Sequence, residues 1–114
     1  MQASSHVEDG LHIVRLSGEI DLHQSPVLRS LLAEHVEAER PALLLDFSQV
    51  EYIDSSGLAT LVEYVQKSSA HGGRLALGGV SERVKTVFDL VRLGEVFPVH
   101  VSLDDAKAAL SSGA

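Results

Sequence analysis

Cysteine is absent from the 114 residues of this chain, which excludes disulfide bonds and cysteine-based metal sites. Aromatic residues make up only 4% of the chain whereas hydrophobic residues make up 45%, so we expect an aliphatic core. Basic residues are also scarce, because nine Lys and Arg stand against sixteen Asp and Glu, for a formal charge of −7. That balance disfavours nucleic-acid binding, which normally needs a basic face.

Long apolar runs are missing too, and none approaches the length of a membrane span. The N-terminus has no basic segment followed by a hydrophobic one, as a signal peptide would have. We therefore expect a cytoplasmic protein with no direct membrane insertion. A chain of this length supports one hydrophobic core. We predict a single domain over residues 8–110, with flexible termini at residues 1–7 and 111–114.

The pattern of apolar residues predicts strands alternating with helices, and hence an α/β fold. The first two strands are joined by a short break, so we expect them to be antiparallel neighbours. The third is apolar without alternation, as in a central strand covered on both faces. Pro98 confines the last strand to an edge. The expected strands are residues 10–17, 19–22, 42–47, 74–77 and 96–101.

Four helices are expected between and after these strands, each with a start or stop signal. The predicted caps are Ser25 before Pro26, then Asp54, Ser81 and Ser102. The first helix should stop by Arg40, the second near Ser69, the third at Gly94 and the last at Leu110. Together the elements predict a mixed, mostly parallel sheet of four to five strands packed with about four helices.

The most informative stretch is residues 52–64, where Asp54 precedes an amphipathic helix. Ser55 and Ser56 fall in the first helical turn, where unpaired N–H groups and the helix dipole favour added negative charge. One hypothesis is a phosphorylation site, and the plainer alternative is that these residues only cap the helix. Gly57 is unfavourable in a helix, which indicates close approach of a large group or crowding against the sheet.

Other candidate sites are weaker. Asp21, Asp46 and Asp54 lie at or after predicted strand ends and could bind a metal or act as acid and base, although loop carboxylates and caps are the more common outcome. The six histidines are scattered, which favours structural roles. The GxxxxGK[ST], GxGxxG and GxSxG patterns are absent. We therefore expect no enzyme activity, no catalytic residues, no metal and no cofactor.

Three segments follow one another in the sequence: Gly18-Glu19-Ile20-Asp21, then Leu44-Leu45-Asp46-Phe47-Ser48, then Ile53-Asp54-Ser55-Ser56-Gly57-Leu58. In this order they resemble the STAS domain of bacterial anti-sigma factor antagonists. Later stretches around Gly73, Ser81 and Leu93 are similar to the rest of that domain, so the resemblance covers nearly the whole chain.

The resemblance implies a partner-switching regulator of transcription. Such a module binds an anti-sigma factor, commonly a serine kinase, and thereby frees a sigma factor. Phosphorylation would fall on the second serine of the motif, here Ser56, and a PP2C-type phosphatase would reverse it. The implied partner-binding residues are Asp21, Asp54, Ser55, Ser56, Gly57 and Leu58.

A phosphate on Ser56 would add about −1.5 to −2 charges at the docking surface. Repulsion between unit charges about 6 Å apart, at an effective dielectric near 20, is roughly 3 kcal/mol, or about a hundredfold in affinity. Two alternatives stay open, because fold alone does not settle function. One is a non-phosphorylated STAS subunit of a transporter, lipid-trafficking or stress-signalling complex. The other is a small-molecule or nucleotide sensor that uses the helix N-terminus as an anion site.

Overall fold

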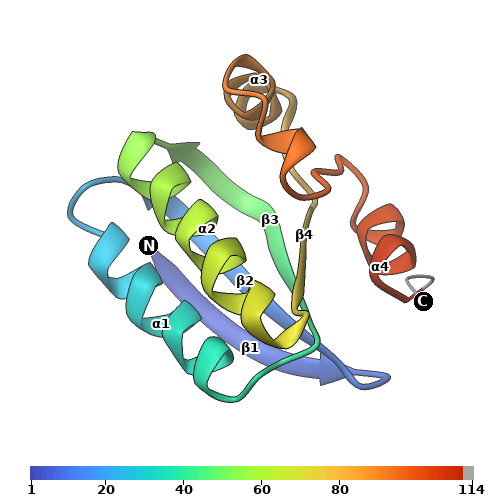
Figure 1. Cartoon of the computed structure of the whole chain (residues 1–114). Coiled ribbons are helices and arrows are strands. Elements are labelled where there is room, and N and C mark those ends of the chain that lie inside the picture. The colour runs from blue at the N-terminus through green and yellow to red at the C-terminus, as the bar shows by residue number, and fades with distance from the viewer. Residues whose placement is uncertain (112–114) are drawn as a thin grey trace.

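The computed structural model describes residues 1–111 and shows one four-stranded sheet with helices on both faces (Figure 1). In spatial order the strands are β1 (Gln2–Glu8), β2 (Leu11–Ile20), β3 (Ala42–Ile53) and β4 (Arg74–Gly78). β1 pairs antiparallel with β2, whereas the β2–β3 and β3–β4 pairs are parallel. The predicted mixed, mostly parallel sheet is therefore confirmed.

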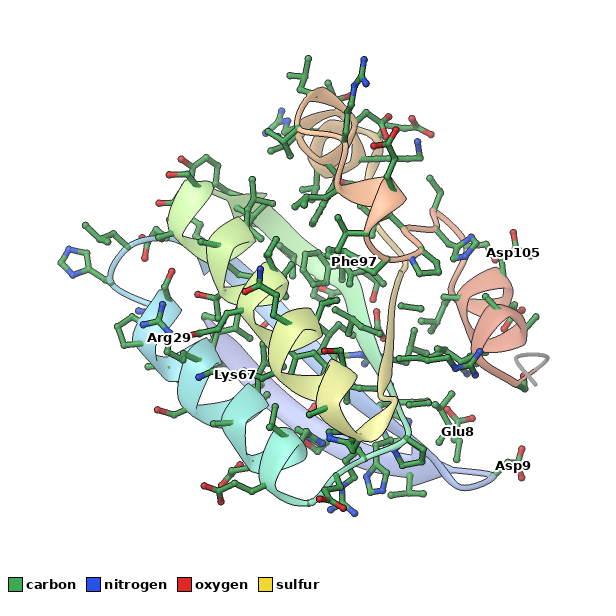
Figure 2. All side chains as sticks on the ribbon, viewed as in Figure 1. Glu8, Asp9, Arg29, Lys67, Phe97 and Asp105 are labelled. Carbon is green, nitrogen blue, oxygen red and sulfur yellow. The ribbon has the colours of Figure 1, made fainter. Side chains whose placement is uncertain are left out.

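The four helices are α1 (Ser25–Glu37), α2 (Ser55–Ser68), α3 (Glu82–Leu90) and α4 (Leu103–Ser111), with short 3₁₀ helices at Ser69–His71 (η1) and Leu93–Glu95 (η2). α1 and α2 pack side by side on one face of the sheet, and α4 covers the other (Figure 1). Arg29 of α1 and Lys67 of α2 lie at the boundary between these two helices (Figure 2). The carboxylate of Glu63 on α2 lies 2.8 Å from Arg29, which joins the helices, and 3.4 Å from Lys67 one turn further along α2.

β3 supplies core residues to both faces of the sheet, as its unbroken apolar run predicts. Leu43 and Leu45 join the large cluster beneath α1 and α2. Leu44 points the other way and packs with Ala106 and Leu110 of α4. A strand apolar on one face only would leave one of these helices without a partner, so this run fixes the layered arrangement.

The N-terminal third differs from the sequence-based expectation. Residues 10–17 and 19–22 are not two neighbouring strands, because β2 runs through Gly18 to Ile20. Gly18 adopts a φ of +87°, and the pairing with β3 shifts register beside it, so a bulge takes up the irregularity without ending the strand. The antiparallel neighbour of β2 is β1. The expectation that residues 1–7 are a flexible terminus is therefore wrong for Gln2 onwards.

The C-terminal third also needs correction. The segment 96–101 does not form a strand and contributes one isolated bridge, between Leu77 and Val99. α3 ends at Leu90 and not at Gly94, because Arg92 takes a left-handed φ of +58° that a helix cannot continue through. The sequence predicts a flexible terminus over residues 111–114. Ser111 is instead the last residue of α4, and residues 112–114 lie outside the described residues. Within residues 1–111, no helix is long and apolar enough to cross a membrane.

Candidate functional site

The candidate site lies where the parallel strands β2 and β3 end together. Ile20 pairs with Ile53 in the last register position, and the Asp54 N–H donates to the Ile20 carbonyl at 3.1 Å. The loop leading into α1 and the first turn of α2 therefore meet at the same edge of the sheet (Figure 1). This edge brings the predicted residues Asp21, Asp54 and Ser56 into one neighbourhood.

Asp54 is the N-cap of α2, as the sequence predicts. Its carboxylate accepts hydrogen bonds from the N–H groups of Ser56 at 2.9 Å and Gly57 at 3.2 Å, and from the Ser56 hydroxyl. The Ser56 hydroxyl lowers the pKa of Asp54 most. Desolvation, the next-largest effect, raises it, and the N–H groups of Gly57 and Ser56 lower it by smaller amounts, so the net shift is downward. The Leu22 backbone N–H contributes to the same lowering. Asp54 thus stays an anion that holds Ser56 in place.

Ser25 is a site residue that the sequence analysis placed in another role. It is not the cap of α1, because Gln24 occupies that position and Ser25 begins the helix. Its buried hydroxyl lies 2.7 Å from the Ser56 hydroxyl and donates to the Asp21 carbonyl at 2.8 Å. In the local sequence, the Ser25-Pro26 pair predicts only the start of a helix and not a contact with α2.

The hydroxyls of Ser25 and Ser56 carry two hydrogens for three contacts. The Ser56 hydroxyl donates its hydrogen bond to the Asp54 carboxylate, because a charged acceptor forms the stronger bond. The Ser25 hydrogen is then shared between the Ser56 oxygen and the Asp21 carbonyl, which already accepts two backbone N–H groups. Ser56 is therefore held from both sides, and its carbonyl also accepts from the Thr60 hydroxyl at 2.9 Å.

Gly57 is required by crowding against the sheet. A Cβ placed there would lie 2.7 Å from Ile53 Cγ1 and 2.8 Å from Ile20 Cγ2. Of the two explanations that the sequence left open, the structure supports this one. Gly57 and Leu58 are both buried, whereas Ser55 is exposed and Ser56 is half-buried. Among these four residues, only the two serines have side chains that reach the surface.

The three aspartates do not form one cluster. Asp21 is half-buried, and its carboxylate accepts the Gln24 N–H at 3.1 Å in the turn before α1. Asp46 lies inside β3 and not at its end, roughly 25 Å along the strand from Asp54. No group of three or more metal-ligating side chains occurs within residues 1–111.

Asp46 serves the sheet itself. Burial raises the pKa of Asp46. Hydrogen bonds from the Ser48 hydroxyl and N–H, together with the Arg15 guanidinium at 3.1 Å, outweigh this effect and leave the pKa below its usual range. Arg15 lies on the neighbouring strand β2, opposite Asp46 in the parallel register. The Asp46 carboxylate therefore binds only groups of the sheet beside the register shift that follows Arg15, and it is separate from the site at Ser56.

Known proteins are similar in sequence to this chain over most of its length. The family model described as STAS domain matches residues 2–106. The anti-sigma-B factor antagonist of Bacillus subtilis (strain 168) is 34% identical over 86 residues, 75% of this chain and 78% of that protein. The anti-sigma F factor antagonist of Paenibacillus polymyxa is 29% identical over 92 residues, 80% and 79% of the two chains.

A solved structure agrees over the whole fold. The crystal structure of an anti-sigma factor antagonist from Mycobacterium paratuberculosis is similar with a TM-score of 0.88 and 30% sequence identity. The match covers 96% of this chain and 93% of that one. The similarity therefore includes β1 and α4 as well as the central sheet.

Proposed function

This chain belongs to the STAS domain family, and from that premise we propose that it is an anti-sigma factor antagonist controlled by phosphorylation of Ser56. In the unphosphorylated state it binds an anti-sigma factor with serine kinase activity, which frees a sigma factor. A PP2C-type phosphatase restores the unphosphorylated state. The chain acts in this scheme as a binding protein and not as an enzyme.

The observation that carries the proposal is the setting of Ser56. Its hydroxyl is half-buried on the first turn of α2, held by Asp54 and Ser25 at the edge where two strands end. A phosphate there stays near the positive end of the helix dipole, so the domain can remain folded. The same phosphate changes the charge of any surface that covers this turn. The similar proteins are antagonists of anti-sigma factors, which supports an anti-sigma factor as the partner of this chain.

The first test is intact mass spectrometry of the protein after incubation with ATP and an extract of its source cells. We expect a gain of one phosphate in the wild type and in Ser55→Ala, and none in Ser56→Ala. Ser55→Ala is the matched control because it removes the neighbouring exposed hydroxyl from the same turn. A gain that persists in Ser56→Ala would contradict the assignment of the acceptor.

The second test measures binding to the kinase purified from that extract by its phosphorylating activity. We expect Ser56→Ala to bind constitutively and Ser56→Glu to bind poorly. Equal binding by the wild type and both variants would make the switch wrong. No phosphate gain with a competent extract would instead favour a constitutive STAS subunit of a larger complex.

A further inference from the structure

The outer edge of β1 is open. In the spatial order of the strands, β1 has β2 on one side, and within residues 1–111 no strand pairs with its other side. Its side chains are exposed along the whole strand, so no helix covers it on either face of the sheet. The opposite edge of the sheet is partly covered, because the Leu77 N–H donates to the Pro98 carbonyl at 3.0 Å and the Leu77 carbonyl accepts the His100 N–H at 2.9 Å. β1 is therefore the edge at which a further strand can pair over its full length.

The turn between β1 and β2 decides which backbone groups of β1 face outwards. Asp9 and Gly10 form a two-residue turn with φ values of +49° and +80°, which is the geometry of a type I′ hairpin. In such a hairpin the flanking residues Glu8 and Leu11 form a hydrogen-bonded pair. Because the pattern alternates, every second residue of β1 bonds to β2, and the N–H and C=O groups of the others face away from the sheet. The outward-facing residues are Ala3, Ser5 and Val7.

Features that prevent strand pairing are missing from this edge. Exposed edge strands are commonly blocked by Pro, by Lys or by a bulge. Residues 1–10 contain no Lys, Arg or Pro, and the register of β1 with β2 is uninterrupted from Gln2 to Glu8. The carboxylate on the strand is already paired, because Glu8 Oε2 lies 3.2 Å from His6 and 3.1 Å from Lys107. A second strand therefore meets neither a steric block nor an unpaired carboxylate along β1.

The sequence of β1 is complementary to itself in the antiparallel direction. Ser5 is the middle residue of the strand and its N–H and C=O face outwards, so a two-fold axis beside Ser5 pairs all seven residues with a second copy. Val7, which is 57% exposed, is then covered by Ala3 of the second copy. No pair places like charges opposite one another, which would weaken the pairing. The opposed residues are Gln2 and Glu8, Ala3 and Val7, Ser4 and His6, and Ser5 with itself.

We propose that two copies of this chain form a homodimer by pairing their β1 strands antiparallel about a two-fold axis beside Ser5. The outward-facing positions of each strand give about six backbone hydrogen bonds between the copies, and the two sheets become one continuous sheet. A single strand pair is a small interface, so the dimer is reversible and depends on concentration. The interface lies on β1 and the proposed phosphorylation site on α2, so this inference does not rest on the proposed function.

Sedimentation equilibrium tests the dimer. For the wild type, we expect the mean mass to rise from one chain towards two as the protein concentration increases from about 10 µM to about 1 mM. Ser5→Pro should remain at one chain, because proline removes an outward N–H and is tolerated in an edge strand where that N–H faces solvent. Far-ultraviolet circular dichroism checks that the variant is folded. A wild type that stays at one chain throughout, or a folded Ser5→Pro protein that dimerises like the wild type, would overturn the proposal.

Cysteine substitution locates the two-fold axis, because the chain has no cysteine of its own. About the proposed axis, the Cα atoms of the two copies of residue 5 are about 5.5 Å apart, a separation that a disulfide can span. The two copies of residue 3, and likewise of residue 7, are displaced by the distance from residue 3 to residue 7, about 14 Å along a strand. All three positions are exposed, which makes the variants matched. Under oxidation by copper–phenanthroline in air, we expect Ser5→Cys to form a disulfide-linked dimer about tenfold faster than Ala3→Cys or Val7→Cys.

The outcomes of the cysteine series are distinct. Equal rates for the three variants would show that cross-linking reflects random collision, and would overturn the pairing. A faster rate for Ala3→Cys or Val7→Cys would overturn the axis at Ser5. The series also decides the question if Ser5→Pro does not fold. None of these outcomes bears on the proposed function, because phosphorylation of Ser56 and binding to the kinase are measured separately.

Discussion

The hydroxyl oxygens of Ser25 and Ser56 lie 2.7 Å apart, although 31 positions separate the two residues in the sequence. One begins α1 and the other lies in the first turn of α2, so the contact ties together the starts of the two helices on the same face of the sheet. The proposed phospho-acceptor is thereby held by its own helix, through Asp54, and by a neighbouring helix.

Replacing Ser25 with Ala should destabilise the protein. The substitution removes a buried hydroxyl and leaves the Ser56 oxygen with one fewer partner, for an expected loss of about 1 kcal/mol in unfolding free energy. Urea denaturation measures it. Ser30→Ala is the control, because Ser30 is exposed on the same helix. Equal stabilities of the two variants would show that the Ser25 hydroxyl contributes nothing.

Replacing Gly57 with Ala should also destabilise the protein, although Ala is the better helix former by about 1 kcal/mol. The added Cβ would overlap Ile53 and Ile20, and overpacking of this kind costs about 1–3 kcal/mol. Gly94→Ala is the matched control because nothing lies within 4 Å of a Cβ at that position. Thermal unfolding of both variants measures the difference, and a Gly57→Ala protein as stable as the control would contradict the crowding.

Asp54 should make stability depend on acid pH. Its pKa in the folded protein is below the ordinary value of 3.8, so it contributes stability above that value and loses it as the pH falls through the folded pKa. Asp54→Asn keeps a good N-cap but cannot titrate. We expect the unfolding free energy of the wild type to fall more steeply than that of Asp54→Asn between pH 6 and pH 2.5. Parallel curves would show that the carboxylate charge is not coupled to folding.

His35 should produce a second pH dependence nearer neutrality. Its pKa is lowered from 6.5 by burial first, then by Arg40 and His12, with Glu34 acting in the opposite direction. The unfolded chain therefore takes up the proton more readily, and stability is lost as the pH falls below about 6.5. We expect the wild type to lose more stability than His35→Gln between pH 7.5 and pH 5.5. An equal loss in both proteins would assign the effect to another group.

Local chemistry determined a large part of this fold and of its site. The Asp54 cap forms between residues two and three positions apart, so a short window of sequence contains both partners. The apolar run of 42–45 requires cover on both faces, which fixes β3 at the centre of the layers. The order of motifs from Gly18 to Leu58 was specific enough to indicate the family.

Tertiary structure decided what depends on partners far away in the chain. β1 is mostly polar and exposed along its whole length, so its backbone pairing with β2 leaves no periodic pattern in its sequence. The break at Gly18 marks a bulge and not an end, because β3 continues to pair with β2 on both sides of it. Ser25 joins the site only when the helices pack. Long-range hydrogen bonds of this kind form between groups that are ordinary in their local sequence, and only the packed fold brings them together.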